Sequence, residues 1–283
     1  MIRSAYSALR PALFSLPAET AHRAVHRGLA TVQHTPVETL LRDRLVVDDD
    51  RLAVDAFGQS FANPIGVAAG FDKNAELPSV LGALGFGHVE VGGVTARAQP
   101  GNPRPRMFRL VEDRAIINRM GLNNEGADAV GERLRTSPDP GIPVGVNVAL
   151  SEATDAADAP EDYRYTYEQV ADVADYLAVN VSCPNSEGMR ELQNRDSLEA
   201  ILGELVDAGA EPLLVKLSPD LPEPAVEDAL DVVDAFDLDG VIATNTTTDR
   251  PGGLQSPNRA ERGGLSGSPI EARATEMVRF VAE

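Results

Sequence analysis

Residues 176–218 contain the strand–helix–strand pattern that decides the fold: YLAVNVS (176–182), SLEAILGELVDAG (197–209) and PLLVKLS (212–218). The first and last runs are apolar on both faces, which is typical of strands covered by helices. The middle segment has apolar residues near i, i+3, i+4 and i+7, the spacing of a helix with one buried face. The pattern therefore predicts two parallel strands joined by a helix.

The same alternation extends along most of the chain. The other strand-like runs are PIGVAAG (64–70), HVEVGGVT (88–95), PVGVNVAL (143–150) and GVIATNT (240–246). Helical spacing recurs in AELPSVLGALG (75–85), GADAVGERLR (126–135), TYEQVADVAD (166–175), AVEDALDVVDAF (225–236) and SPIEARATEMVRFVAE (268–283). Six β/α units in series, with no GxGxxG opening the first helix, favour an α/β fold of the (β/α)8 TIM-barrel type over a doubly wound sheet.

Two further regions lie ahead of this alternation. The pattern of residues 1–45 predicts two or three short helices, an N-terminal helical extension. Residues 46–283 are expected to form the barrel domain. RLAVDAFGQSFANP (51–64) predicts a hairpin with Gly58 and Gln59 at its turn. The length of 283 residues is by itself compatible with one large domain or two smaller ones.

The net charge of the chain argues against one class of partner. The formal net charge is −19, from 44 acidic and 25 basic residues, which argues against nucleic acid because phosphate binding needs a basic face. Lys73 and Lys216 are the only lysines. An acidic, lysine-poor composition resembles that of proteins from salt-loving cells, where salt screens the repulsion between like charges. The two lysines are therefore either chance survivors or positions where an ammonium group is needed.

The cysteine count and the N-terminus exclude several other classes. A single cysteine, Cys183, excludes a disulfide framework and a cysteine-based zinc site and fits a reducing compartment, so no metal is expected. Pro11 and Pro17 interrupt the start of the chain, and no run reaches the roughly 20 apolar residues of a membrane-spanning helix. Neither a signal peptide nor a membrane span is predicted.

Polar residues gather where the predicted strands end, which is where enzymes of the barrel type place their chemistry. The set comprises Gly70, Asp72, Lys73, Asn74, Gly93, Thr95, Asn147, Asn180, Ser182, Cys183, Asn185, Lys216, Thr244, Asn245 and Thr246. Asparagine is a poor strand former, and any one of these asparagines could simply serve a turn or a cap. Together they suggest a layer of neutral donors and acceptors for a planar, amide-rich ligand, with the lysines offsetting negative charge.

The order of the motifs resembles the dihydroorotate dehydrogenase family from about residue 10 onward. The matching blocks include NPIGVAAGFDKN (63–74), QPGNPRPRMFRL (99–110), INRMGLNNEG (117–126), VNVSCPNSEGMRELQ (179–193), VKLSPDL (215–221) and GGLSGSP (263–269). The resemblance implies an FMN enzyme that oxidises dihydroorotate to orotate in pyrimidine synthesis. PAETAH (17–22) resembles the class 2, quinone-reducing branch, which is membrane-associated.

The resemblance also implies roles for matching positions. FMN would contact Ala69, Gly70, Gly93, Asn147, Asn180, Lys216, Thr244 and Gly267. Dihydroorotate would be held by Lys73, Asn118, Arg119, Met120, Gly121, Leu122, Asn180, Asn185, Asn245 and Thr246. A quinone would lie near His22 and Arg109, although each also fits an ordinary surface role.

Cys183 would be the catalytic base of such an enzyme. The oxidation needs a group that takes a proton from one carbon while a hydride leaves the other, and a thiol can serve near neutral pH. A small buried hydrophobic residue is the plainer alternative. Class 2 relatives generally carry serine here and class 1 relatives cysteine, so the electron acceptor stays open between quinone and a class 1 type. Gly93 also departs from the family, which commonly has threonine or serine there.

The remaining expectations concern partners, location and length. A quinone-type enzyme would contact the membrane peripherally through its N-terminal helices, at the cytoplasmic face, and the oligomeric state stays open. The alternatives are another FMN-dependent pyrimidine oxidoreductase and a catalytically silent fragment. Only six β/α units are present, and the family's glycine-rich phosphate loop is not found, so a chain truncated at its C-terminus is expected.

Overall fold

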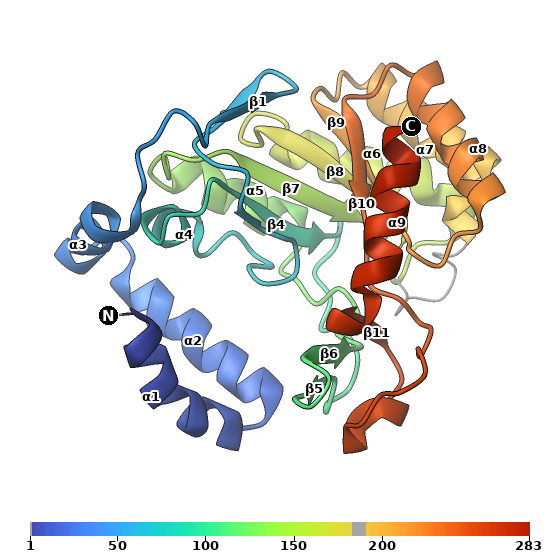
Figure 1. Cartoon of the computed structure of the whole chain (residues 1–283). Helices are drawn as coiled ribbons and strands as arrows, with labels where there is room; N and C mark the ends of the chain where they lie inside the picture. Colours follow the sequence, from blue (N-terminus) through green and yellow to red (C-terminus); the bar gives the residue numbers. More distant parts are fainter. Residues whose placement is uncertain (1, 183–190) are drawn as a thin grey trace.

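The computed structural model describes residues 2–182 and 191–283, and its centre is a curved parallel sheet (Figure 1). Within these residues the sheet has six strands in the order β10-β9-β8-β7-β4-β3, and each neighbouring pair is parallel. The strands are β3 Gly66–Val67, β4 His88–Val94, β7 Val144–Ala149, β8 Tyr176–Asn180, β9 Leu213–Leu217 and β10 Gly240–Ala243. The spatial order follows the chain order, as in a barrel, so the predicted α/β fold of TIM-barrel type is confirmed.

Helices pack on the outside of this sheet (Figure 1). They are α4 Pro78–Ala83, α5 Ala127–Thr136, α6 Ala159–Val170, α7 Arg195–Asp207, α8 Glu223–Ala235 and α9 Glu271–Ala282. In α7 the buried leucines and isoleucine recur with helical spacing and join the main core. Every residue of β7, β8 and β9 is buried, which explains why these strands read as continuous apolar runs.

Helix α6 differs from its predicted position. The segment 166–175 was expected to be helical throughout, but α6 begins at Ala159 and ends at Val170. Pro160 occupies the first turn, where a missing backbone N–H costs nothing. Beyond Val170 the chain turns, and the backbone N–H groups of Val173 and Ala174 both donate to the Val170 carbonyl. The prediction of a helix over 171–175 was therefore wrong.

Three helices precede the sheet in the described part of the chain: α1 Ile2–Ser15, α2 Ala18–Val32 and α3 Pro36–Leu45. Figure 1 shows α1 and α2 as an antiparallel pair set apart from the outer helices, and α2 contacts β5. Helix α3 is joined to α4 by buried Glu38, whose carboxylate accepts a hydrogen bond of 2.5 Å from Ser79 Oγ. Among the described residues, no helix has the length and apolar character needed to cross a bilayer.

The predicted hairpin is present as β1 Val54–Ala56 and β2 Gln59–Phe61. Ala56 pairs with Gln59, so Phe57 and Gly58 form the turn, and the prediction of Gly58-Gln59 was wrong by one residue. Both turn residues have positive φ, 38° and 74°, as a two-residue turn between right-twisted strands requires.

A second, antiparallel sheet was not predicted. It consists of β5 Met107–Leu110, β6 Ala115–Asn118 and β11 Gly264–Gly267 in the order β11-β6-β5, with a small core of Leu110, Ala115, Ile117 and Leu265. Short 3-10 helices complete the described structure: η1 Ala156–Asp158, η2 Glu191–Gln193, η3 Pro257–Ala260 and η4 Ser268–Ile270. This sheet carries residues 118–122 to the edge of the parallel sheet.

Candidate active site

A cavity of about 840 Å³ lies at the carboxyl ends of the parallel strands. Small-molecule sites typically measure about 300–1,000 Å³. Strand ends form one wall, the segment after β6 a second, and α1 with α2 a third. The predicted residues that line it are Ala69, Gly70, Lys73, Gly93, Asn118, Met120, Gly121, Leu122, Asn147, Asn180, Lys216, Thr244, Asn245 and Thr246, together with His22 and Arg109.

The floor of the site contains a buried ion pair between β9 and β4, two strands that β8 and β7 separate in the sheet. Lys216 on β9 lies with its Nζ 3.0 Å from Oε1 of Glu90 on β4. The same Glu90 oxygen accepts a hydrogen bond of 2.9 Å from Asn147 Nδ2 on β7. The three residues are between 0% and 7% exposed, so each polar group depends on the others for its partners.

The amide side chains continue outward from this ion pair as a chain of hydrogen bonds. Asn180 Nδ2 donates to Asn147 Oδ1 at 3.1 Å, and Asn245 Nδ2 donates to Asn180 Oδ1 at 3.2 Å. Ser182 closes the network: its hydroxyl donates to the Lys216 carbonyl at 2.9 Å and accepts from Asn245 Nδ2 at 2.9 Å. Because the strands run parallel, their ends bring together residues that are far apart in sequence.

Tyr163 supports this network from outside the sheet. It is a fully buried residue of α6, and its hydroxyl donates to the Asn180 carbonyl at 2.9 Å. The bond fixes the last residue of β8, from which the segment containing Cys183 continues. Cys183 and Asn185 themselves lie outside the described residues.

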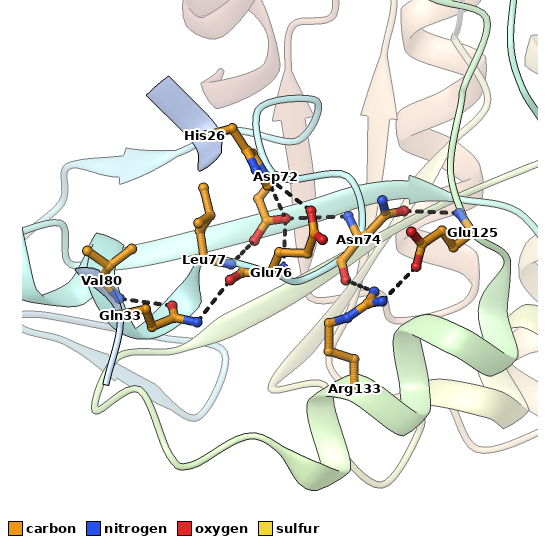
Figure 2. Close-up of polar contacts among 9 residues, drawn as sticks. All are labelled: His26, Gln33, Asp72, Asn74, Glu76, Leu77, Val80, Glu125 and Arg133. Carbon is orange, nitrogen blue, oxygen red and sulfur yellow. Dashed lines mark hydrogen bonds and ion pairs between the residues drawn. The ribbon is translucent and has the colours of Figure 1, made fainter. Parts of the chain in front are cut away.

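A buried aspartate shapes the loop that carries Lys73. Figure 2 shows the Asp72 carboxylate accepting from the backbone N–H groups of Leu77 at 2.7 Å, Glu76 at 2.9 Å and Asn74 at 3.4 Å. The side chain of Asp72 is 0% exposed, so these bonds are shielded from water. The carboxylate thereby folds residues 72–77 into a compact turn and sets where Lys73 leaves the backbone.

Helices on both sides hold this turn in place (Figure 2). Directly after α2, its C-cap residue Gln33 donates to the Glu76 carbonyl at 2.9 Å and accepts from the Val80 N–H at 3.2 Å. From α5, Arg133 donates to the Asn74 carbonyl at 2.6 Å. The loop is thus joined to an N-terminal helix and to an outer helix of the sheet.

His26 of α2 also contacts the turn. Its Nε2 lies 3.8 Å from an Asp72 oxygen and 3.5 Å from a Glu76 oxygen. The contact with Asp72, with a smaller contribution from Glu76, raises the pKa of His26 above its usual value despite partial burial. A protonated His26 therefore ties α2 to the loop of Lys73 more strongly than a neutral one.

The segment after β6 forms the wall opposite Lys73. Asn118, Met120, Gly121 and Leu122 line the cavity, but Arg119 is directed elsewhere: its Nη1 lies 2.8 Å from Glu261, and its guanidinium lies over the ring of Phe108. Gly267 is also not among the described residues that line the cavity.

The wall formed by α1 and α2 is mainly apolar. Leu13, Phe14 and Val25 line the cavity, whereas Leu29 and Val32 of α2 pack against the main core. The cavity side of α2 presents His22, whose ring meets Phe71 edge-on at 5.3 Å. Burial lowers the pKa of His22, and the charge of Lys73 lowers it further, so His22 is neutral near pH 7.

Arg109 fastens α1 to β5. Its guanidinium donates to the carbonyls of Leu16 at 2.8 Å and Leu13 at 3.3 Å, at the end of α1, and lies 4.9 Å from the Phe14 ring centroid. These carbonyls have no intrahelical partner, so the cation also matches the negative end of the helix.

The site fits a flat, polar cofactor such as FMN. Lys216 and the amides supply a cation, donors and acceptors on one wall, which suits a ring system with carbonyl and imide groups. The backbone comes close at Gly93, where an added Cβ would lie 2.8 Å from Leu122 Cδ2 and 3.3 Å from Asn147 Oδ1. The larger residue usual in the family would therefore require Leu122 to move, and glycine keeps this wall open.

Several functional residues were missed from the sequence. Glu90, Tyr163 and His26 were not predicted to take part. A signal existed for Glu90, because a lone carboxylate within the apolar run 88–95 needs a buried partner. Tyr163 and His26 lie on helices whose contacts could be known only once the elements were placed.

Comparison with known proteins gives consistent matches. The family model for dihydroorotate dehydrogenase matches residues 51–283. A dihydroorotate dehydrogenase (quinone) from Haloarcula marismortui is 66% identical over 98% of this chain and 79% of its own length, and one from Natronomonas pharaonis is 63% identical with the same coverage. The crystal structure of the Eimeria tenella enzyme in complex with ferulenol superposes with a TM-score of 0.86 at 35% identity, covering 95% of this chain and 79% of that one.

Proposed function

The chain belongs to the dihydroorotate dehydrogenase family, and we propose that its strand-end cavity binds FMN and dihydroorotate side by side. The chain is a quinone-type dihydroorotate dehydrogenase, an oxidoreductase that converts dihydroorotate to orotate in pyrimidine biosynthesis. The observation that carries the proposal is the continuous hydrogen-bond network from Glu90 and Lys216 through Asn147 and Asn180 to Asn245, which lies along the cavity.

FMN would lie against the inner wall of the cavity. Ala69, Gly70, Gly93, Asn147, Asn180, Lys216, Thr244 and Gly267 are the residues proposed to hold it. When bound, FMN supplies the hydride acceptor that no amino-acid side chain provides. Lys216 would place its ammonium group near the flavin ring, and Asn147 and Asn180 would hydrogen-bond to the polar edge of that ring.

Dihydroorotate would lie between FMN and the Lys73 loop. Lys73 would pair with its carboxylate, and Asn245 and Thr246 would face its ring. The other proposed contacts are Asn118, Arg119, Met120, Gly121, Leu122, Asn180 and Asn185. The side chain of Arg119 pairs with Glu261, so a contact from this residue would come from its backbone.

Cys183 is proposed to be the catalytic base. The oxidation removes a proton from one ring carbon and a hydride from its neighbour, and the thiolate Sγ would take the proton while the hydride passes to the cofactor. Ser182, the residue before Cys183, is held by hydrogen bonds to the Lys216 carbonyl and to the Asn245 side chain. The substrate thus loses two electrons and two hydrogens, and a quinone receives the electrons.

Residues 1–45 would form the quinone side of the molecule, and residues 46–283 the FMN-binding barrel. The apolar wall of Leu13, Phe14 and Val25 leads toward His22 and Arg109, the residues proposed to lie near the quinone. Tyr6 and Leu9 of α1 are 51% and 60% exposed, a pattern that suits peripheral insertion into a membrane surface. We propose that this surface lies on the cytoplasmic face of the cell membrane.

Replacement of Cys183 tests the proposed chemistry. Cys183→Ala should lower turnover by about 10²–10⁴-fold, the usual contribution of a general base, while binding of FMN and orotate stays close to wild type. Cys183→Ser should retain part of the activity with a changed pH profile. Orotate binding, followed by its effect on the flavin spectrum, is the control for an intact site. Turnover near the wild-type value in Cys183→Ala would disprove the assignment.

A further inference from the structure

Among the described residues, Glu90 is the only acidic residue whose side chain hydrogen-bonds to the proposed FMN-binding side chains, and it does so from outside the cavity lining. It lies on β4, is 6% exposed, and its Oε1 accepts from both Lys216 Nζ and Asn147 Nδ2. Both donors line the cavity, whereas Glu90 is not among the described residues that do. A carboxylate placed in this position is costly unless its partners are well oriented.

The carboxylate determines the direction of every hydrogen bond beyond it. A carboxylate can only accept, so Asn147 must turn its NH2 group toward Glu90 and its oxygen toward Asn180. Asn180 then donates to Asn147 and keeps its own oxygen for Asn245 and the Ser182 N–H. The pattern of donors and acceptors that the cavity presents is therefore set from Glu90 outward.

The same carboxylate offsets the charge of Lys216. At 3.0 Å the two groups form an ion pair within the interior, where solvent screens them little. A ligand in the cavity meets an ammonium group whose charge is compensated on its far side. Two-electron reduction places negative charge on the flavin, and a nearby positive charge favours it. The Glu90–Lys216 pair would therefore tune how readily the cofactor accepts electrons.

We propose that Glu90 is a positioning residue that orients Lys216 and Asn147 and lowers the reduction potential of the bound flavin. The proposal rests on FMN occupying this cavity. Glu90 itself touches neither cofactor nor substrate, and it acts through the two side chains that it holds.

The test is the midpoint potential of the flavin bound to the whole protein, measured anaerobically against reference dyes. Glu90→Gln keeps the shape of the side chain and removes its charge, which leaves the Lys216 ammonium uncompensated. One charge about 10 Å away at an effective dielectric constant of about 20 changes an equilibrium by roughly tenfold. For a two-electron couple this raises the potential by about 30 mV. Lys216→Met should shift it in the opposite direction.

The controls separate positioning from a merely structural role. Glu112→Gln, at an exposed glutamate of the β5–β6 turn, should leave the potential unchanged. A residue needed only for packing would weaken FMN binding in Glu90→Gln without moving the potential, and that result, or a lower potential, would overturn the proposal.

Should Glu90→Gln not fold, Glu90→Asp carries the test. Its carboxylate is one methylene shorter and cannot reach both donors, so the potential should rise by less than expected for glutamine, and an unchanged potential would overturn the proposal. Wild-type protein that takes up no FMN would instead refute the proposed function, so the two failures are distinguishable.

Discussion

The Asp72 turn provides a direct link between a buried carboxylate and substrate binding. In Asp72→Asn one oxygen becomes an NH2 group, and the side chain can no longer accept from both Leu77 N–H and Glu76 N–H. Hydrogen bonds to charged groups contribute about 1.5–3 kcal/mol each, and the remaining bond loses its charge. Because the site is fully buried, we expect the free energy of unfolding to fall by roughly 2–3 kcal/mol.

Urea unfolding measures this loss, with an unchanged slope and a lower midpoint. The loosened turn also carries Lys73, so the KM for dihydroorotate should rise several-fold while the KM for quinone changes little. Asp48→Asn, at an exposed aspartate before β1, is the matched control and should match wild type in both measurements. An Asp72→Asn variant with the unfolding midpoint of the control would show that the turn does not depend on this carboxylate.

The two histidines of α2, the net charge and Arg109 give four further predictions. Because the pKa of His26 is raised in the folded protein, its protonation stabilises the fold fully below the unfolded pKa of about 6.5, and this stabilisation is lost as the pH rises through the folded pKa. In urea unfolding, His26→Gln should therefore be less stable than wild type at pH 5.5 and equally stable at pH 8.5. Because the pKa of His22 is lowered in the folded protein, the fold loses stability as the pH falls below about 6.5. His22→Gln should therefore lose less stability than wild type between pH 8.5 and pH 5.5. If the free energies of unfolding of His26→Gln and His22→Gln changed with pH in the same way as that of wild type, both assignments would be contradicted. The net charge of −19 predicts that the melting temperature rises between about 0.1 and 2 M KCl as repulsion is screened, and a flat or falling curve would show that the acidity serves another purpose. Arg109→Ala frees the end of α1 and should raise the KM for quinone several-fold, while dihydroorotate reduces the flavin at the wild-type rate in stopped-flow measurements; an unchanged quinone KM would place the quinone elsewhere.

The parallel sheet could be predicted because buried strands and amphipathic helices leave strong local patterns. The polar strand ends could be predicted as well, since a barrel gathers the ends of parallel strands whatever their separation in sequence. The element boundaries at Val170 and at the Phe57–Gly58 turn depend on hydrogen bonds that periodicity does not report. These corrections leave the arrangement of the strands unchanged.

The contacts that were missed are those between distant residues. Strand β11 pairs with β6, about 150 residues earlier, and the short run Gly264–Gly267 has no pattern of its own. Glu90 and Lys216 are 126 residues apart, so neither segment reveals that the other neutralises it. His26 meets Asp72 only after α2 has packed beside the loop. Side-chain pairing across elements and the second sheet thus required the structure, whereas the strands of the parallel sheet did not.

The reaction of the flavin-loaded protein with dihydroorotate in the absence of oxygen tests the central claim most directly. Flavin absorbance should bleach on mixing with dihydroorotate and return when a quinone is added, and Lys73→Met should bleach only at much higher dihydroorotate concentrations. A wild-type protein that binds FMN but keeps its flavin oxidised in excess dihydroorotate would contradict the assignment of this cavity as the site of dihydroorotate oxidation.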